Sequence, residues 1–171
     1  MIEIEFNDAE VTQALRRVAA RLSDLTPLMQ EIGELLVATT EQRFKDGKSP
    51  EGLAWAPKSE VTVERQKRSP DGYDPRLLFW KGTLASGIHA EIRPDQVAVG
   101  SPMIYAATMQ FGAAQGAFGA FIGRDKLGRD HFHHIPWGDI PARPFLGISD
   151  GDRDAILGIA REYLDPDAGS A

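Results

Sequence analysis

The fold is decided by one stretch, residues 77–112, which reads LLFWKGTLASGIHAEIRPDQVAVGSPMIYAATMQFG. Gly82 indicates a turn that leads into a short helical pattern. Two runs of strand character, Ile88–Ile92 and Val97–Val99, are separated by a Pro-Asp turn and predict a β-hairpin. A compact helical unit, Tyr105–Phe111, follows and ends at a glycine. This combination is a fold signature without visible catalytic chemistry.

A second segment, IPARPFLGIS at residues 140–149, complements the first. Pro141 and Pro144 favour an extended chain, and Arg143 between them offers a guanidinium fork to a carboxylate or a backbone carbonyl. Two interpretations stay open. The segment is either a rigid docking strand for a partner or a packed connection within the chain, in which case Phe145 belongs to the core.

Length and composition are typical of one globular domain, residues 1–171, because 42% of the 171 residues are apolar and 26% are charged. The chain has no cysteine, so disulfides and thiolate metal sites are excluded. A net charge of −6 argues against a general nucleic-acid coat. No apolar run approaches the roughly 18 residues of a membrane span, and the N-terminus has no signal-peptide pattern, which predicts a soluble, unexported chain.

Residues 1–47 predict one strand and two helices. Met1–Phe6 alternates apolar and acidic residues, which is the period of a strand with one face exposed to solvent. Asn7 or Asp8 can cap a first helix, whose apolar stripe consists of Val11, Leu15, Val18 and Leu22. Thr26 and Pro27 indicate the start of a longer helix that ends near Gly47. We expect the two helices to form an ordinary packed pair.

A loop and a basic helix follow. Trp55 lies in a Gly- and Pro-rich loop, where it is either an anchor that folds the loop back or an exposed contact; burial of large aromatics favours the anchor. Ser59 can cap a short helix that ends at Arg68. The positive cluster around this helix indicates either a solvated face or a site for an acidic partner. Its members are Lys58, Arg65, Lys67 and Arg68.

Residues 113–139 have no clear helical or strand period and predict a long projecting loop. Loops of this length are uncommon in compact domains, so we expect this arm to become ordered against a partner such as a neighbouring subunit. It contains His131, His133 and His134, which are candidate metal ligands. The sequence lacks a matching zinc motif, and structural or subunit contact is the favoured interpretation.

The C-terminal part predicts a third amphipathic helix that starts at Ser149 or Asp150 and is ended by Pro166. Acidic residues in its first turn, Asp152 among them, complement the helix dipole. Residues 165–171 predict a frayed, flexible tail. The chain lacks the Gly-x-Ser-x-Gly, His-Glu-x-x-His, phosphate-loop and dinucleotide motifs, so no catalytic residue and no cofactor site is nominated.

Several motifs, taken in order, resemble the phage virion morphogenesis family, the Mu-like tail completion or neck proteins of tailed bacteriophages. They are RF at residues 43–44, SPEGLAW at 49–55, PKSEVT at 57–62, LL at 77–78, GTLASGI at 82–88, VAVGS at 97–101, YAATMQFG at 105–112 and IPARPFLGIS at 140–149. The sequence departs from the pattern at Met109, where a histidine is common, and in the long 113–139 insertion.

The resemblance implies a non-enzymatic virion protein that acts in tail completion and head–tail joining at the neck, as a homo-oligomeric ring for which six and twelve copies both fit. It implies an α+β fold, in which about four mostly antiparallel strands pack with three main helices. The implied partners are connector or adaptor proteins and tail-terminator or tail-tube proteins. No membrane and no specific nucleic acid is implied, although DNA would pass through the ring.

Three other functions stay open. One is a tail terminator that caps the tail tube, and a more distant one is a metal-dependent hydrolase that uses the three histidines. The third is a module that binds an acidic partner through the positive cluster around Lys58 and Arg65–Arg68. For the assembly role we expect no metal site, and we expect the subunit or partner contacts to include large aromatic and polar side chains. The residues expected at these contacts are Trp55, Tyr105, Gln110, Phe111, Phe118, Phe121, Phe132, Trp137, Arg143 and Phe145.

Overall fold

The computed structural model describes residues 8–165 of the chain. Within this part the chain forms six helices and four strands, which confirms the predicted α+β class. The helices are α1 (Ala9–Leu22), α2 (Thr26–Asp46), α3 (Glu60–Lys67), α4 (Thr83–Ser86), α5 (Ala106–Phe111) and α6 (Asp150–Leu164). The strands are β1 (His89–Arg93), β2 (Gln96–Gly100), β3 (Ala120–Arg124) and β4 (Asp130–His134). The strand expected at Met1–Phe6 and residues 166–171 of the expected tail lie outside the described residues.

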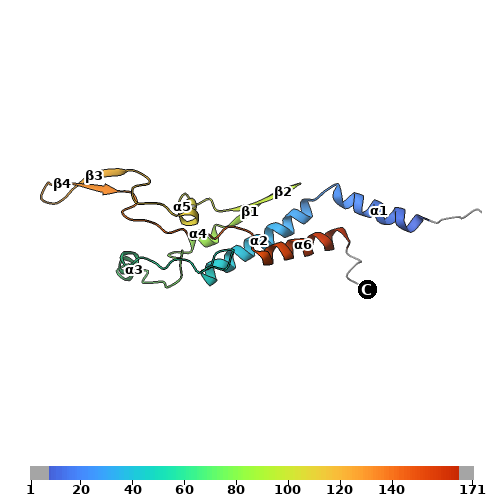
Figure 1. Cartoon of the computed structure of the whole chain (residues 1–171), viewed down its shortest axis with the longest axis horizontal. Coiled ribbons are helices and arrows are strands. Elements are labelled where there is room, and N and C mark those ends of the chain that lie inside the picture. Colours follow the sequence, from blue (N-terminus) through green and yellow to red (C-terminus); the bar gives the residue numbers. More distant parts are fainter. Residues whose placement is uncertain (1–7, 166–171) are drawn as a thin grey trace, which may run out of the picture.

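Helix α2 is the central packing element: the β1–β2 hairpin contacts it, and α6 runs alongside it (Figure 1). Gly33 allows the close approach of the hairpin, since a Cβ at this position would lie only 2.8 Å from Ile92 Cδ1. The helix ends where the sequence predicts. Gly47 has a left-handed backbone with φ of 65°, and its N–H donates to the Arg43 carbonyl.

The predicted β1–β2 hairpin is confirmed. Its strands are antiparallel, and the register runs from His89 opposite Gly100 to Arg93 opposite Gln96, which leaves Pro94 and Asp95 in the turn. The four strands do not form one sheet. They form two separate two-stranded sheets, β1–β2 and β3–β4.

The core lies where the C-terminal end of α2 meets residues 77–112 and 140–149. Its buried members are Phe44, Trp55, Leu84, Ile88, Ala106 and Phe145. Phe145 is completely buried, and its ring lies 5.2 Å from that of Phe44. Trp55 packs edge-on against Phe44 at 5.7 Å and donates from Nε1 to the Pro144 carbonyl at 2.8 Å. Trp55 is therefore the predicted loop anchor, and 140–149 is a packed connection within the chain.

The projecting arm at 113–139 is not a structureless loop. Its outer part is the β3–β4 hairpin, which Figure 1 shows extending away from the rest of the molecule. A bridge between Ala113 and Ile140 closes the base of the arm. At the tip the Asp125 carboxylate accepts hydrogen bonds from the Leu127 and Arg129 N–H groups. The alternating pattern is missing from the sequence because neither face of this hairpin is buried, and alternation is selected only where one face packs on a core.

Helix α1 does not form the expected packed pair with α2. It extends past the end of α2 and touches α6, and none of its residues is buried (Figure 1). Its apolar stripe is largely open, with Val11 and Leu22 each 54% and Leu15 65% exposed. The amphipathic pattern correctly predicts the helix, but its apolar face has no partner within residues 8–165 that would bury it.

Candidate interaction surfaces

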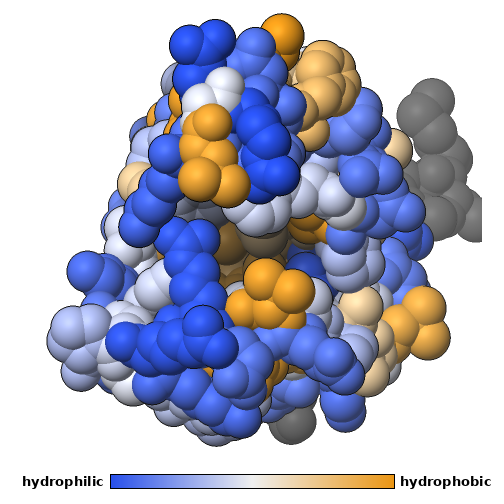
Figure 2. Space-filling model, turned by 90° about the vertical axis from the view of Figure 1, so that its left-hand side faces the viewer, coloured by the Kyte–Doolittle hydropathy of each residue, from blue (hydrophilic) through white to orange (hydrophobic). Residues whose placement is uncertain are grey.

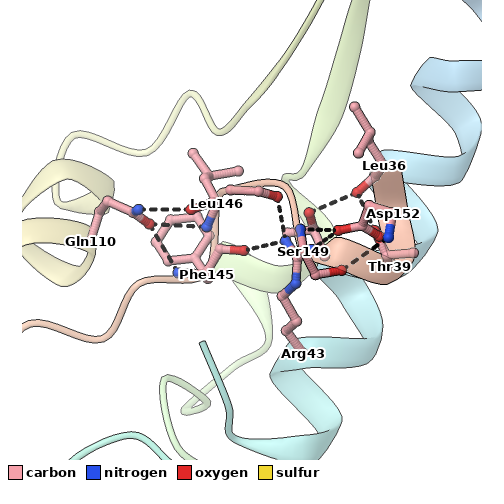
Figure 3. A network of polar contacts seen from close by, with 10 residues as sticks. Leu36, Thr39, Arg43, Gln110, Phe145, Leu146, Ser149 and Asp152 are labelled. Carbon is pink, nitrogen blue, oxygen red and sulfur yellow. Dashed lines mark hydrogen bonds and ion pairs between the residues drawn. The ribbon is translucent and has the colours of Figure 1, made fainter. Parts of the chain in front are cut away.

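Gln110 on α5 connects residues 77–112 to residues 140–149 (Figure 3). Its side-chain oxygen accepts from the N–H groups of Phe145 at 2.9 Å and Leu146 at 3.0 Å, and its amide donates to the Leu146 carbonyl at 3.0 Å. The Arg143 N–H adds a bond to the Met109 carbonyl at 2.8 Å. One amide side chain thus satisfies three backbone groups of an irregular segment, which fixes that segment against α5.

A second network ties α6 to α2 (Figure 3). Arg43 donates to the Phe145 carbonyl at 3.1 Å and the Gly147 carbonyl at 2.9 Å, and forms an ion pair with Asp152. Ser149 and Asp152 also form a reciprocal capping box at the start of α6, so the predicted Ser149 cap is confirmed. Asp152 therefore does more than complement the helix dipole: it neutralises a buried arginine.

The Asp152 carboxyl is 3% exposed. Burial by itself raises its pKa, but hydrogen bonds from Ser149 and Thr39 and the charge of Arg43 outweigh that effect and hold the pKa below its usual value of 3.8. The carboxylate is therefore ionised in the folded protein at neutral pH.

The guanidinium of Arg143 binds backbone carbonyls of its own chain, donating to Ala56 at 2.8 Å and Pro57 at 2.7 Å. Burial lowers its pKa. A carboxylate and a backbone carbonyl were the two kinds of partner predicted for Arg143, and the structure shows backbone carbonyls. These hydrogen bonds hold the loop that carries Trp55 against residues 140–149.

The ten expected contact residues therefore divide into two groups. Trp55, Arg143 and Phe145 are buried and hold the chain together. Gln110 is half-buried, and its oxygen and amide are bonded within the chain. The other six are exposed and remain candidates for contact: Tyr105, Phe111, Phe118, Phe121, Phe132 and Trp137.

Four of these six aromatics belong to the arm. On one face the His133 ring stacks between Phe121 at 5.0 Å and Trp137 at 5.8 Å. On the other face Phe132 packs edge-on against His134 at 5.0 Å. Trp137 is nevertheless 71% and Phe132 65% exposed. An arm with large apolar side chains on both faces gains stability when it is inserted into another surface.

The three histidines of the arm do not converge on a point. Antiparallel pairing places His131 and His133 on one face of the hairpin and His134 on the other. His131 pairs with Asp125 at 3.0 Å and, with Arg129, lowers the pKa of that carboxyl to about 2. Within residues 8–165 no group of three or more His, Cys, Asp or Glu side chains is arranged to hold a metal ion.

The basic cluster predicted around α3 is not a single surface. Lys58 turns inward and donates to Gln66 Oε1 at 2.9 Å and to the Asp74 carbonyl at 2.5 Å, and burial lowers its pKa. Lys67 and Arg68 pair with Glu64, while Arg65 lies over the Trp80 ring at 5.6 Å. These internal pairings do not favour the acidic-partner interpretation.

A cleft of about 810 Å³ opens between the arm and α3, and Figure 2 shows it as a hollow with an apolar floor. Its walls come from residues 57–66, 78–84, 105–109 and 139–143. Tyr105 and Arg143 are the expected contact residues that line it, while Phe79 and Trp80 line it without having been predicted. Leu78, also in the wall, has a left-handed φ of 53°, which is uncommon for a residue other than glycine. The cleft can bury apolar surface of a partner.

Sequence reasoning also missed Ile104, which is 96% exposed beside Tyr105. Ile104 stands in the short apolar run Met103–Tyr105, which is too short to show a periodicity that would mark a surface residue. No helix in residues 8–165 is both long enough and apolar enough to cross a membrane.

Comparison with known proteins places this architecture in a family. The model of the phage virion morphogenesis family matches residues 6–165. The chain is 31% identical to Mu-like prophage FluMu G protein 2 of Haemophilus influenzae, over 96% of each chain. It is 27% identical to putative capsid assembly protein G of Escherichia phage Mu, over 92% of this chain and 94% of that protein. No solved structure matches the chain.

The domain exposes apolar groups at both of its ends, in the α1 stripe and on the arm. The chain belongs to the phage virion morphogenesis family. The resemblance inferred from the ordered motifs is thereby confirmed, and the protein is a bacteriophage component of virion assembly.

Proposed function

We propose that this protein is a non-enzymatic structural component of the virion that completes the tail and joins it to the head at the neck as a homo-oligomeric ring. Family membership supports the role in virion assembly. The observation that carries the finer proposal is the placement of two exposed apolar features, the α1 stripe and the arm, at opposite ends of the molecule (Figure 1).

Two different apolar surfaces on one chain favour heterologous contacts. In a ring each subunit presents one surface to one neighbour and a different surface to the other, and the ring closes if the rotation allows it. Exposed features at separate ends supply what such an arrangement needs. They also leave the arm free to reach a different protein above or below the ring.

In the proposed complex the ring lies at the head–tail interface of the virion and assembles in the host cytoplasm. Its partners are the connector or adaptor proteins on the head side and the tail-terminator or tail-tube proteins on the tail side. DNA passes through the ring without specific recognition, in keeping with the net charge of −6. Copy numbers of six and twelve both remain proposals.

The test is electron microscopy of lysates from a phage that lacks the gene, with the wild-type gene supplied from a plasmid as the control. We expect filled heads and tails of normal length that stay unjoined. Tails of uncontrolled length would instead indicate a terminator that caps the tail tube. Intact virions in normal numbers would overturn both roles.

A further inference from the structure

The described chain leaves α1 with an apolar stripe that nothing covers. At about 100° per residue, Val11, Leu15, Val18 and Leu22 fall within about 60° of one another on the helix surface. Val11, Leu15 and Leu22 are each more than half exposed. The helix also differs from the acidic chain as a whole, because it carries Arg16, Arg17 and Arg21 against one acid, Glu10.

Contacts with α6 hold this stripe away from α2 of the same chain. The Tyr163 hydroxyl donates to the Asp24 carbonyl at 2.6 Å, and the Arg21 carbonyl oxygen lies 3.3 Å from the same hydroxyl. Arg21 donates back to the Tyr163 carbonyl, and its guanidinium lies 5.7 Å from the centre of the Tyr163 ring. These contacts fix the C-terminal end of α1 beside the end of α6, so that α1 points outward (Figure 1).

A groove that could receive this stripe lies between α2 and β1 on the same molecule. It has a volume of about 460 Å³, and its apolar lining residues are Val37, Ala38, Ala90 and Ile92. Glu34 and Glu41 of α2 also line it. The groove therefore combines an apolar lining with two acidic side chains.

The stripe and the groove match in length and in charge. The α2 residues that line the groove run from Gln30 to Glu41, and the stripe runs from Val11 to Leu22. Each span covers eleven residue steps, or about 16 Å of helix. The net charge of α1, three arginines against one glutamate, is opposite in sign to that of Glu34 and Glu41 in the groove, so the helix and the groove attract each other.

We propose that α1 of one copy docks in the α2–β1 groove of the next copy and forms the repeating contact of the ring. This inference rests on the proposed homo-oligomer and names its interface. The contact is heterologous, because the donating helix and the receiving groove are different surfaces. Each subunit both gives a helix and receives one, which allows closure without a free α1 stripe.

The absence of cysteine makes the proposal testable by cross-linking. The purified full chain with Leu15→Cys and Ala38→Cys is treated with a short bis-maleimide and run under denaturing conditions. We expect a ladder that extends beyond the dimer, because each copy carries both halves of the contact. A chain that carries only one of these two cysteines can yield a dimer at most. A matched control combines Leu15→Cys with Leu53→Cys, which is 70% exposed but outside the groove, and should give no ladder.

Native mass spectrometry of the wild type separates this inference from the proposed ring. An oligomeric wild type whose Leu15→Cys, Ala38→Cys variant gives no ladder overturns the docking of α1 and leaves the ring in place. A cross-link confined to the monomer shows that α1 folds onto its own groove and also overturns it. A wild type that is monomeric at all concentrations overturns the ring and the docking together.

Charge reversal supplies an independent readout on the intact protein. Glu34→Arg with Glu41→Arg should raise the protein concentration needed for half-maximal assembly about tenfold, since the attraction between the basic helix and the acidic groove becomes repulsion. Adding Arg16→Glu and Arg17→Glu should restore assembly. Unchanged assembly in the reversed variant, with the fold intact by circular dichroism, would contradict the assigned contact.

Discussion

Arg43 of α2 and Asp152 of α6 form an ion pair whose side chains are only 9% and 3% exposed, although 109 positions separate them in the sequence. The same arginine holds the carbonyls of Phe145 and Gly147, while the same carboxylate accepts from the Ser149 N–H. The pair thus joins the central helix, the 140–149 segment and the last helix at one point.

Replacement of Asp152 by Ala should destabilise the protein by about 3 to 5 kcal/mol, because it leaves the Arg43 charge buried without its partner. Urea denaturation followed by circular dichroism measures the change. Asp154→Ala is the matched control: Asp154 is exposed on the same helix, so its loss should change the stability by about 0.5 kcal/mol or less. Equal effects of the two substitutions would contradict the role given to the pair.

The contribution of Asp152 should also depend on pH. Its pKa in the folded protein lies below 3.8, so its stabilising effect is complete above that value and is lost as the pH falls through the folded pKa. The stability difference between the wild type and Asp152→Asn should therefore be constant from pH 7 to about pH 5 and shrink in more acidic solution. Urea midpoints measured from neutral to strongly acidic pH test this, and a difference independent of pH would be inconsistent with an ionised Asp152.

Gln110→Ala should loosen the 140–149 segment, because the N–H groups of Phe145 and Leu146 lose their acceptor. The expected cost is about 1 to 3 kcal/mol. Hydrogen exchange followed by mass spectrometry should show faster exchange in peptides that cover these two amides, while α2 is affected less. Gln96→Ala, in an exposed strand, is the control. Unchanged protection at Phe145 and Leu146 would exclude the bonds to Gln110 as the cause of order there.

Gly112→Ala should be more damaging than Gly72→Ala, although both glycines have a φ near 75°. An added Cβ at Gly112 would lie 2.6 Å from the Ile140 carbonyl oxygen and 2.8 Å from the Ala142 nitrogen, whereas one at Gly72 meets nothing within 4 Å. The Gly72 variant should cost about 1 to 2 kcal/mol for its backbone alone. The difference in stability between the two variants, measured by thermal unfolding, gives the cost of the clash at Gly112. Equal losses of stability in both variants would show that no such clash exists.

The arm should matter for assembly and little for folding. Phe132→Ser combined with Trp137→Ser removes two exposed rings, so we expect the urea midpoint to stay close to that of the wild type. The titre of phage complemented by this variant should fall strongly, because the partner loses its apolar contacts. Leu53→Ser, also exposed but outside residues 113–139, should complement normally. Full complementation by the double variant would remove the arm from the proposed contacts.

The sequence predicts those parts of the fold in which local signals agree with packing. Gly47 ends α2, Ser149 caps α6, and the Pro-Asp turn closes β1–β2. Local signals fail at the β3–β4 hairpin, since strands with two exposed faces carry no alternation. They fail again at α1, where a periodic apolar stripe specifies a helix but not the element that covers it.

The candidate interaction surfaces show the same limit of prediction from local sequence patterns. Large aromatics mark core and contact equally well in sequence, so only burial separates Trp55 and Phe145 from Phe132 and Trp137. Gln110 and Arg143 act through backbone groups distant in sequence, which no local pattern encodes. The order of motifs, in contrast, identifies the family because it reflects the whole chain.

Immunogold electron microscopy of virions that carry an epitope-tagged copy of this chain tests the proposed neck position most directly. We expect gold particles at the head–tail junction of intact virions, with labelling lost in particles made without the gene. Labelling along the tail or on the head surface, or virions that contain none of the protein, would contradict a ring at the neck.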